Sequence, residues 1–329
     1  MNIAIIGGGF CGTMTAVHLM RDREVPIHIH LINKGYPLAR GVAYDPHTAS
    51  LLLNVPDQRM SAFADLPGHY VQWLKETGKE HADKNRFPDD HHFSTRQQYG
   101  SYLSEVWEKT VRQIPANKKI RVYHDYADDI TEEGDRWTIS LREHPALTVD
   151  IAILATGNDL PCFPAGLDSS FMNSRYYFGD PWKKGCMENL EELNDILIIG
   201  NGLTMADTVI ALKERGFKQA IHTVSPNGYR LQPWKESKEP YDGIAISAVL
   251  DQAVLHQKIS LSELLGIMNK HRKIAARLNE SIYPLIDVIR PYTKYLWQSF
   301  DTNEKRLFIK RLSSFWEAIR HRLPVKNRE

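Results

Sequence analysis

Three glycines near the N-terminus are the residues of this 329-residue sequence whose spacing most clearly indicates chemistry. Gly7, Gly9 and Gly12 follow the pattern G-x-G-x-x-G between an apolar run at 2–6 and a stretch with helical spacing. The first glycine permits a tight turn, the second lets the backbone approach a pyrophosphate, and the third lets helix and strand pack closely. The helix N-terminus offers N–H groups to phosphates, so the turn predicts a dinucleotide site. Its expected contacts are Gly7, Gly9, Phe10, Cys11 and Gly12.

A position for recognising the ribose is expected about 20 residues after the third glycine, at the end of a second strand at 27–32. Asn33 stands there in place of the usual Asp or Glu, and its amide can donate and accept hydrogen bonds. The adjacent Lys34 supports a rival interpretation, in which this first site holds NADP through a 2′-phosphate. We give that interpretation less weight because a second glycine motif follows.

The second motif lies in the middle of the chain, where a predicted strand at 195–199 runs into Gly-Asn-Gly and a predicted helix at 204–214. Met205 replaces the third glycine, which makes this motif weaker than the first. The following strand, 220–224, ends without an acidic residue, which favours NADP over NAD, although NAD also fits. The expected contacts are Gly200, Gly202, Leu203, Thr204, Ser225 and Arg230.

Two such units in one chain, with Ala-Thr-Gly at 155–157 between them, are typical of flavoproteins that hold FAD first and NAD(P)H second. The chain resembles the bacterial FAD/NAD(P)-binding protein family that is distantly related to N-hydroxylating flavin monooxygenases. The resemblance rests on the stretches 40–44, 52–56, 60–63, Arg96 with 99–103, 180–182, 200–207, 290–291, 296–297, and Trp316 with 320–322. It implies FAD in the first site, a nicotinamide cofactor in the second, and redox chemistry between them. Further contacts that it implies are Arg40, Asn54, Met60, Ser61, Arg96, Thr156 and Gly157.

Some of these residues have a structural interpretation as well. Asn54, Met60 and Ser61 are candidates for lining the flavin ring, but a well-packed loop is an equal alternative. Arg96 could bind the FAD phosphates or a substrate carboxylate through its planar guanidinium, or form a surface salt bridge. Catalytic side chains are not assigned, because flavin chemistry belongs mostly to the cofactor.

The chain also departs from the family in two places. Ser-Pro-Asn-Gly at 225–228 stands where the family commonly has Ser-Arg-Arg-Gly, and longer members continue beyond the position of Glu329. These departures keep open a catalytically degenerate protein that binds FAD or NAD(P) without turnover. The main hypothesis is an FAD-dependent NAD(P)H oxidoreductase, including a monooxygenase acting on a small molecule.

The order of elements predicts an α/β fold with two Rossmann-like dinucleotide-binding units, FAD then NAD(P), and a helical C-terminal region. The expected domains are 1–160 for FAD, with an inserted segment at about 36–118, then 161–244 for NAD(P). Residues 245–329 are expected to pack as helices on the FAD domain. Strands are further predicted at 120–123, 137–141 and 149–154, with a turn at 133–135, and helices near 69–75 and 96–112.

An apolar stripe near the C-terminus is predicted to pack on the core as one helical face. It comprises Phe308, Leu312, Phe315, Trp316, Ile319 and Leu323. The basic stretch 305–311 beside it is expected to be a solvated face, and a membrane or nucleic-acid surface is the weaker alternative.

Composition sets the remaining expectations. The net charge of +1 indicates no polyanionic partner, so neither nucleic acid nor a membrane is expected to bind. Three scattered cysteines, no signal peptide and no long apolar run favour a reducing cytoplasmic location. The acidic and histidine residues at 89–92 lack ligand spacing, so no metal site is expected. The expected partner is a small-molecule substrate, and the motifs specify neither its identity nor the oligomeric state.

Overall fold

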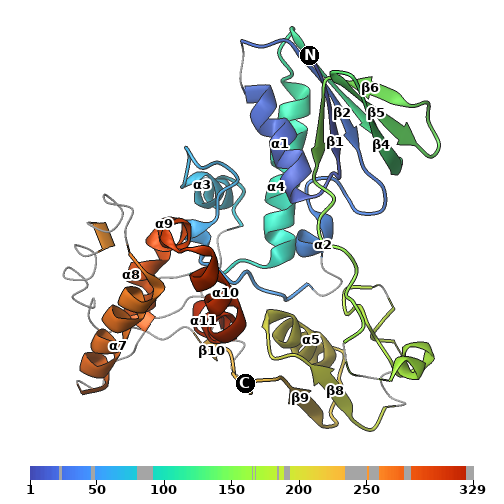
Figure 1. The fold of residues 1–329 in the computed structure, drawn as a ribbon. Helices are drawn as coiled ribbons and strands as arrows, with labels where there is room; N and C mark the ends of the chain where they lie inside the picture. The colour runs from blue at the N-terminus through green and yellow to red at the C-terminus, as the bar shows by residue number, and fades with distance from the viewer. Residues whose placement is uncertain are drawn as a thin grey trace. The chain divides into compact units, whose positions relative to one another are not determined.

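The computed structural model describes residues 1–21, 24–45, 49–79, 92–164, 166, 168–183, 185–188, 193–233, 250–251, 259–277 and 283–323. Two compact units divide the chain, one within residues 1–192 and the other within residues 193–329 (Figure 1). The domain boundaries predicted at 160/161 and 244/245, and the packing of the C-terminal region on the FAD domain, stay predictions.

A parallel sheet forms the centre of the first unit. It consists of β1 (Asn2–Ile6), β2 (Ile27–Ile32), β3 (Lys118–Tyr123) and β7 (Ile151–Leu154), in the order β3-β2-β1-β7. Helices α1 (Phe10–Arg21) and α4 (Arg96–Arg112) lie along one face of this sheet (Figure 1). The bounds predicted for β1, β2 and α4 from apolar spacing are confirmed.

Alternating side chains of the strands fill two separate cores. Ile3 and Ile5 of β1 join a cluster with residues of α1 and α4 that is rich in aromatic rings. Ala4 and Ile6 point to the opposite face and join a smaller cluster. Because a strand alternates its side chains, the near-continuous apolar run at 2–6 indicates a strand buried on both faces, as observed.

The second face of the parallel sheet is covered by an antiparallel sheet of β4 (Ala127–Glu133), β5 (Arg136–Leu141) and β6 (Leu147–Val149). The predicted turn at 133–135 is confirmed, and Gly134 there has a φ of 62°. The single strand predicted at 149–154 is wrong, because β6 and β7 belong to different sheets. Strand β4 was not predicted, since an exposed edge strand rich in acidic residues carries little apolar alternation.

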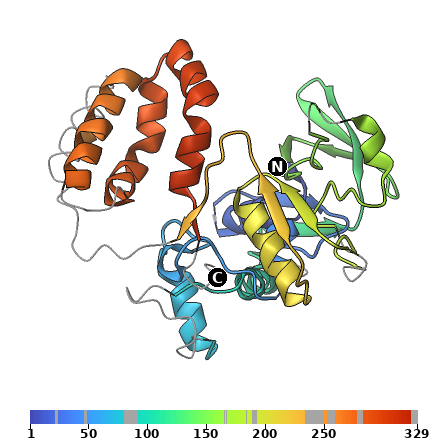
Figure 2. The same ribbon diagram turned by 90° about the horizontal axis from the view of Figure 1, so that it is seen from below.

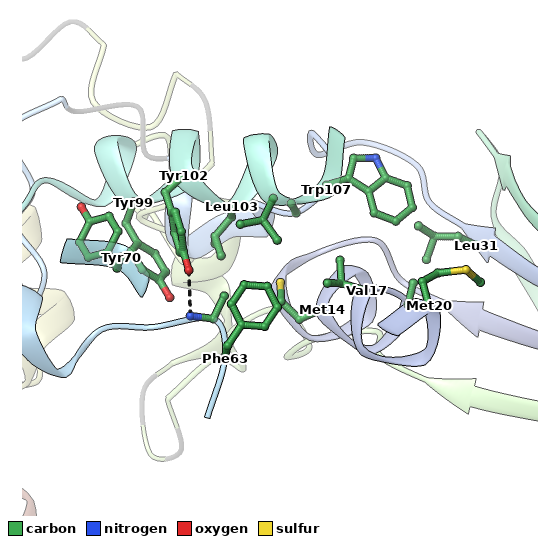
Figure 3. Close-up of a cluster of buried hydrophobic side chains, with 14 of the residues drawn as sticks. Met14, Val17, Met20, Leu31, Phe63, Tyr70, Tyr99, Tyr102, Leu103 and Trp107 are labelled. Carbon is green, nitrogen blue, oxygen red and sulfur yellow. Dashed lines mark hydrogen bonds between the residues drawn. The ribbon is translucent and has the colours of Figure 1, made fainter. Parts of the chain in front are cut away.

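The segment 36–118, predicted as an insertion, contributes to the core of the first unit. It contains α2 (Gly41–Tyr44), the short helix η1 (Asp57–Arg59), α3 (His69–Glu76) and α4. Tyr70 of α3 and Tyr99 and Tyr102 of α4 are almost fully buried in the larger cluster (Figure 3). Helix α4 therefore serves as the crossover between the parallel neighbours β2 and β3. A last short helix, η3 (Ser169–Asn173), follows β7.

The second unit begins with a βαβ element that the sequence predicted. Strands β8 (Ile196–Ile199) and β9 (Ile221–Val224) are parallel, and α5 (Leu203–Glu214) connects them. Two short strands follow, β10 (Gln232–Pro233) and β11 (Arg322–Leu323), which pair in parallel with each other.

Beyond β10, the described residues of the second unit form helices and β11. These helices are α7 (Leu261–Arg277), α8 (Tyr283–Ile289), η5 (Arg290–Tyr292), α9 (Thr293–Ser299), α10 (Thr302–Arg311) and α11 (Ser313–Arg320). Figure 2 shows these helices, in orange and red, as one group. None of the helices in the described part of the chain is long and apolar enough to cross a bilayer.

The apolar stripe predicted as one helical face is distributed over two helices and β11. Helix α10 ends at Arg311 and α11 begins at Ser313, so the prediction of a single continuous helix was wrong. Phe308, Leu312 and Trp316 pack against the helical cluster of their own unit. Phe315 is 41% exposed, because it lies off this row and its ring meets Tyr229 instead.

Candidate functional site

The first glycine turn joins β1 to α1 and is packed against the chain on two sides. Gly7 has a φ of 108°, and a Cβ atom on it would overlap the carbonyl oxygen of Ala155, just after β7. A Cβ atom on Gly12 would overlap the carbonyl oxygen of Gly7. These contacts confirm the tight turn and the close approach of helix to strand that the sequence predicted for the first and third glycines.

Gly9 differs from its two neighbours in the motif. A Cβ atom there would meet Gly41 Cα at 3.6 Å, which is ordinary van der Waals contact. The chain itself therefore tolerates a methyl group at this position. The sequence predicted that a ligand pyrophosphate is what requires glycine here, and the open surroundings are consistent with that role.

Side chains outside the motif hold the turn in place. The N–H of Gly8 donates to Oδ1 of Asn33 at 3.1 Å, and the Asn33 amide nitrogen donates to the carbonyl of Tyr36 at 2.9 Å. Thr13, which is fully buried, donates to the carbonyl of Gly8 at 2.9 Å and accepts from the N–H of Ala39 at 3.1 Å. Asn33 thus supports the turn, and one hydrogen and one lone pair of its amide remain for a ribose hydroxyl.

Thr13 and Ala39 were not among the predicted site residues. A polar residue on the buried face of α1 was a signal for Thr13, because buried hydroxyls need partners. Ala39, which has a φ of 69°, carried no such signal. Lys34 donates to Glu143 at 3.0 Å in an exposed pair, so its ammonium already has a partner away from a 2′-phosphate.

Helix α2 lies beside the beginning of α1. Arg40, just before it, donates from Nε to the hydroxyl of Ser104 at 2.9 Å and lies 3.6 Å from Asp45. The ring of Phe10 meets the edge of the Tyr44 ring at 5.8 Å. Of the predicted contacts, Phe10, Arg40 and Asn33 are therefore brought to the same glycine turn.

Arg96 stands at the first position of α4 and is 9% exposed. Its Nε donates to the carbonyl of Leu52 at 3.3 Å, and its guanidinium lies 5.7 Å from the centre of the Trp182 ring. The alternative of a surface salt bridge is wrong, because the side chain is buried. Burial raises the pKa of the Tyr44 phenol, and the nearby Arg96 opposes that shift only in part.

Two side chains of the predicted flavin-lining loop make hydrogen bonds and packing contacts within the protein. Ser61 donates to the carbonyls of Phe63 and Leu66, at 3.1 and 2.7 Å, and accepts from the N–H of Phe63. Met60 packs against the larger core cluster, and Asn54 is half-buried. The loop interpretation therefore describes Ser61 and Met60, and their contact with a flavin stays a prediction.

The stretch that follows β7 lies next to the first turn. The N–H of Ala155 donates to the carbonyl of Ile6 at 2.8 Å, which extends the pairing of β7 with β1. Thr156 and Gly157 come directly after it and are exposed, and Gly157 has a φ of 80°. Both residues are thus held at the same edge of the sheet as the glycine turn.

The second glycine turn, between β8 and α5, is open. Gly200 has a φ of 113°, its N–H donates to the carbonyl of Val224 at 2.7 Å, and Gly202 precedes α5 as its N-cap. A Cβ atom on either glycine would meet nothing within 4 Å. Leu203 is half-buried and Thr204 is exposed, in the first turn of α5.

Asn201, between these two glycines, was also missed by the sequence analysis. Its amide nitrogen donates to the hydroxyl of Ser225 at 3.1 Å and to the carbonyl of Tyr229 at 3.3 Å. The structure therefore connects the glycine turn to Ser225 at the end of β9, as predicted for a dinucleotide unit. Arg230 follows Tyr229 and is exposed.

Among the described residues, neither the cysteines nor the residue types that bind metals form a further candidate site. The thiols of Cys11, Cys162 and Cys186 are in no disulfide, and Cys11, an expected cofactor contact, is exposed at the start of α1. Within the described ranges, no three His, Cys, Asp or Glu side chains are grouped to hold a metal ion. Residues 89–91 of the acidic and histidine stretch lie outside those ranges.

The part of the chain that contains the first turn is similar to a known protein family. Residues 4–159 match a family model described as FAD-NAD(P)-binding. The matched range contains the first glycine turn, its supporting loop 33–41 and the stretch after β7, which are the parts that the geometry joins. No curated protein matches the sequence.

Solved structures show more distant likenesses. Bacillithiol disulfide reductase Bdr from Staphylococcus aureus has 17% identity and a TM-score of 0.44, over 79% of this chain and 65% of its own. S-allyl-L-cysteine S-oxygenase from Allium sativum has 17% identity and a TM-score of 0.44, over 73% of this chain and 54% of its own. Ornithine N-hydroxylase from Kutzneria sp. 744 has 15% identity and a TM-score of 0.47, over 98% of this chain and 70% of its own. The chain thus spans less than two thirds of the first two proteins.

Proposed function

We propose that this chain is an FAD-dependent NAD(P)H oxidoreductase, with FAD at the Gly7–Gly12 turn and a nicotinamide dinucleotide at the Gly200–Gly202 turn. The observation that carries the proposal is the geometry of the first turn, within the range that matches the FAD-NAD(P)-binding family model. Two of its glycines are required by the fold, whereas Gly9 faces space that the chain does not fill tightly.

The residues around the first turn fit a dinucleotide. Helix α1 begins at Phe10, so the N–H groups of its first turn and its positive dipole end can bind a pyrophosphate. Arg40 adds a cation that Ser104 orients at 2.9 Å. The remaining hydrogen-bonding capacity of Asn33 can reach a ribose hydroxyl, in the role predicted from its position.

The chemistry that bound FAD supplies is acceptance of a hydride from a reduced nicotinamide and delivery of the electrons to a second acceptor. The residues of the chain position and enclose the nucleotides. In the more specific form of the proposal, the second acceptor is oxygen and a small-molecule substrate is hydroxylated or oxygenated. Arg96 is a candidate to bind a substrate carboxylate, because its buried guanidinium is held by Leu52 and Trp182.

The alternative function is nucleotide binding without turnover. The specific observation in its favour is the second turn, where Met205 replaces the third glycine and the described β8–β9 sheet has two strands. In this alternative FAD or NAD(P) binds, but no hydride passes between them.

The first experiment uses Gly9→Ala. A methyl group at Gly9 meets only Gly41 Cα at 3.6 Å, so the variant should fold with an unchanged melting temperature in the absence of FAD. If the pyrophosphate approaches Gly9, the affinity for FAD should fall at least tenfold, about 1.4 kcal/mol. Titration of the flavin fluorescence measures this. Equal affinity in wild-type protein and variant would show that the site is misassigned.

The second experiment separates the oxidoreductase from the alternative. Protein reconstituted with FAD is mixed anaerobically with NADPH or NADH, and bleaching of the flavin absorbance is followed. We expect reduction by both, faster with NADPH, because β9 ends in Ser225 without an acid and Arg230 is near. Bound flavin that neither nucleotide reduces would favour binding without turnover.

A further inference from the structure

The side chain of Asn201 connects the second glycine turn to two positions of the loop that follows β9. Its amide nitrogen lies 3.1 Å from the hydroxyl oxygen of Ser225 and 3.3 Å from the carbonyl oxygen of Tyr229. A backbone carbonyl can only accept, so the nitrogen and not the oxygen of the amide must face Tyr229. Both hydrogens of the amide group are therefore directed into the 225–229 loop.

This hydrogen bond determines in which direction the hydroxyl of Ser225 can donate its hydrogen. Its oxygen accepts from Asn201, so the hydroxyl hydrogen points away from Asn201 and can be donated to a ligand. Ser225 directly follows β9, where a dinucleotide unit of this kind recognises the 2′ position of the adenosine ribose. A hydroxyl donor at that point suits the oxygen atoms of a 2′-phosphate, and charge strengthens such a bond.

The same amide also holds the far end of the loop. The loop turns at Gly228, which has a φ of 61° and donates its N–H to the carbonyl of Ser225 at 3.3 Å. The carbonyl of Tyr229, which accepts from Asn201, immediately precedes Arg230. Asn201 therefore fixes the backbone position from which the Arg230 side chain extends. It also fixes the orientation of the Ser225 hydroxyl.

The oxygen of the Asn201 amide points to a ligand as well. It is buried and accepts no hydrogen bond from the described residues. Buried acceptors in folded proteins nearly always have a donor, and a ribose hydroxyl beside the turn would supply one. This is a second observation, independent of the Ser225 contact, in favour of a ligand at Asn201.

We propose that Asn201 is the positioning residue for cofactor preference: it fixes Ser225 and Arg230 so that the site selects a dinucleotide with a 2′-phosphate. The inference rests on the proposed function, because it assumes that a nicotinamide dinucleotide binds at this turn. It goes further by assigning the preference to a residue of the glycine turn, which reaches the loop after β9 through hydrogen bonds to Ser225 and Tyr229.

The test measures dissociation constants of NADP⁺ and NAD⁺ by calorimetry, with no turnover required. Wild-type protein is compared with Asn201→Ala, Ser225→Ala and the double variant. We expect each single variant to lower the preference for NADP⁺ about tenfold, the size expected for one hydrogen bond to a charged group. Because Asn201 acts partly through Ser225, the double variant should lose less than the product of the two single losses.

Controls keep the outcomes distinct. Asn227→Ala removes an exposed amide two residues from Ser225 and should leave the preference unchanged. If Asn201→Ala does not fold, Ser225→Ala still reports the loss of preference. Equal weakening of NADP⁺ and NAD⁺ in the single variants, or fully multiplicative losses, would overturn the inference while leaving the proposed function intact. Wild-type protein that binds neither nucleotide would overturn both.

Discussion

The two glycine turns share a sequence pattern but differ in what requires their glycines. At the first turn, Cβ atoms on Gly7 and Gly12 would overlap backbone atoms of the chain, and Thr13 and Asn33 hold the turn from outside. At the second turn, Cβ atoms on Gly200 and Gly202 would meet nothing within 4 Å. The fold itself requires glycine at the first turn, whereas backbone conformation at Gly200, with a φ of 113°, is the main local requirement at the second.

This difference teaches that a glycine motif can report packing or ligand approach, and that only surrounding contacts distinguish them. Substituting Gly7 or Gly12 tests the fold, and substituting Gly9 tests the ligand. The second turn has no packed glycine, and a side chain, the amide of Asn201, connects it to the loop after β9.

The largest expected effect comes from paired alanine substitutions at Gly12 and Gly202. Gly12→Ala forces α1 away from the β1 turn, and overpacking of this kind costs about 3 kcal/mol. Gly202→Ala meets no atom within 4 Å and loses only some N-cap preference, under about 1 kcal/mol. Urea unfolding measures both. Similar losses at the two positions would remove the contrast between the turns.

An intermediate effect is expected in the helices of the second unit. Trp316 is partly buried against the helical cluster, so Trp316→Ala should cost about 1.5–3 kcal/mol. A loss of this size would show that packing within the helical cluster stabilises that unit. Thermal unfolding provides the measurement. Phe315→Ala on the same helix, where the ring is 41% exposed, should cost less, and Lys310→Ala should cost within about 0.5 kcal/mol.

The smallest expected effect concerns pH and the sheet that covers the first unit. Burial raises the pKa of Asp125, but hydrogen bonds from His144 and from the N–H groups of Glu143 and Tyr126 outweigh it and hold the pKa at about 2. This pKa lies below the unfolded value of about 3.9. The stabilisation is therefore present above about pH 4 and is lost as pH falls toward 2.

The corresponding measurement is the difference in melting temperature between wild-type protein and Asp125→Asn. It should be a few degrees at pH 7 and should shrink as the pH is lowered to 2.5. Glu132→Gln makes the same acid-to-amide change at an exposed position of β4 and serves as the control. A difference that stays constant with pH would show that the carboxylate is not held in its charged form.

Local patterns in the sequence were sufficient for the regular elements. Apolar runs and helical spacing predicted β1, β2, α4 and the β8-α5-β9 unit. Of these, β1, β2 and α4 bury apolar faces, whereas β8 and β9 are half-buried or exposed. The glycine spacing predicted the first turn and the reasons for Gly7 and Gly12. The family resemblance located Arg40 beside that turn, which spacing alone would not have done.

Contacts between distant residues were decided only by the tertiary structure. The strand predicted at 149–154 became two because its halves pair in different sheets, and the C-terminal stripe is divided between α10 and α11, which meet at Leu312. Thr13 and Asn201 gained roles because their partners lie 5 to 28 residues away along the chain. A sequence determines which residues can form strands, helices and turns, but hydrogen bonds between side chains and remote backbone atoms exist only once those elements have packed.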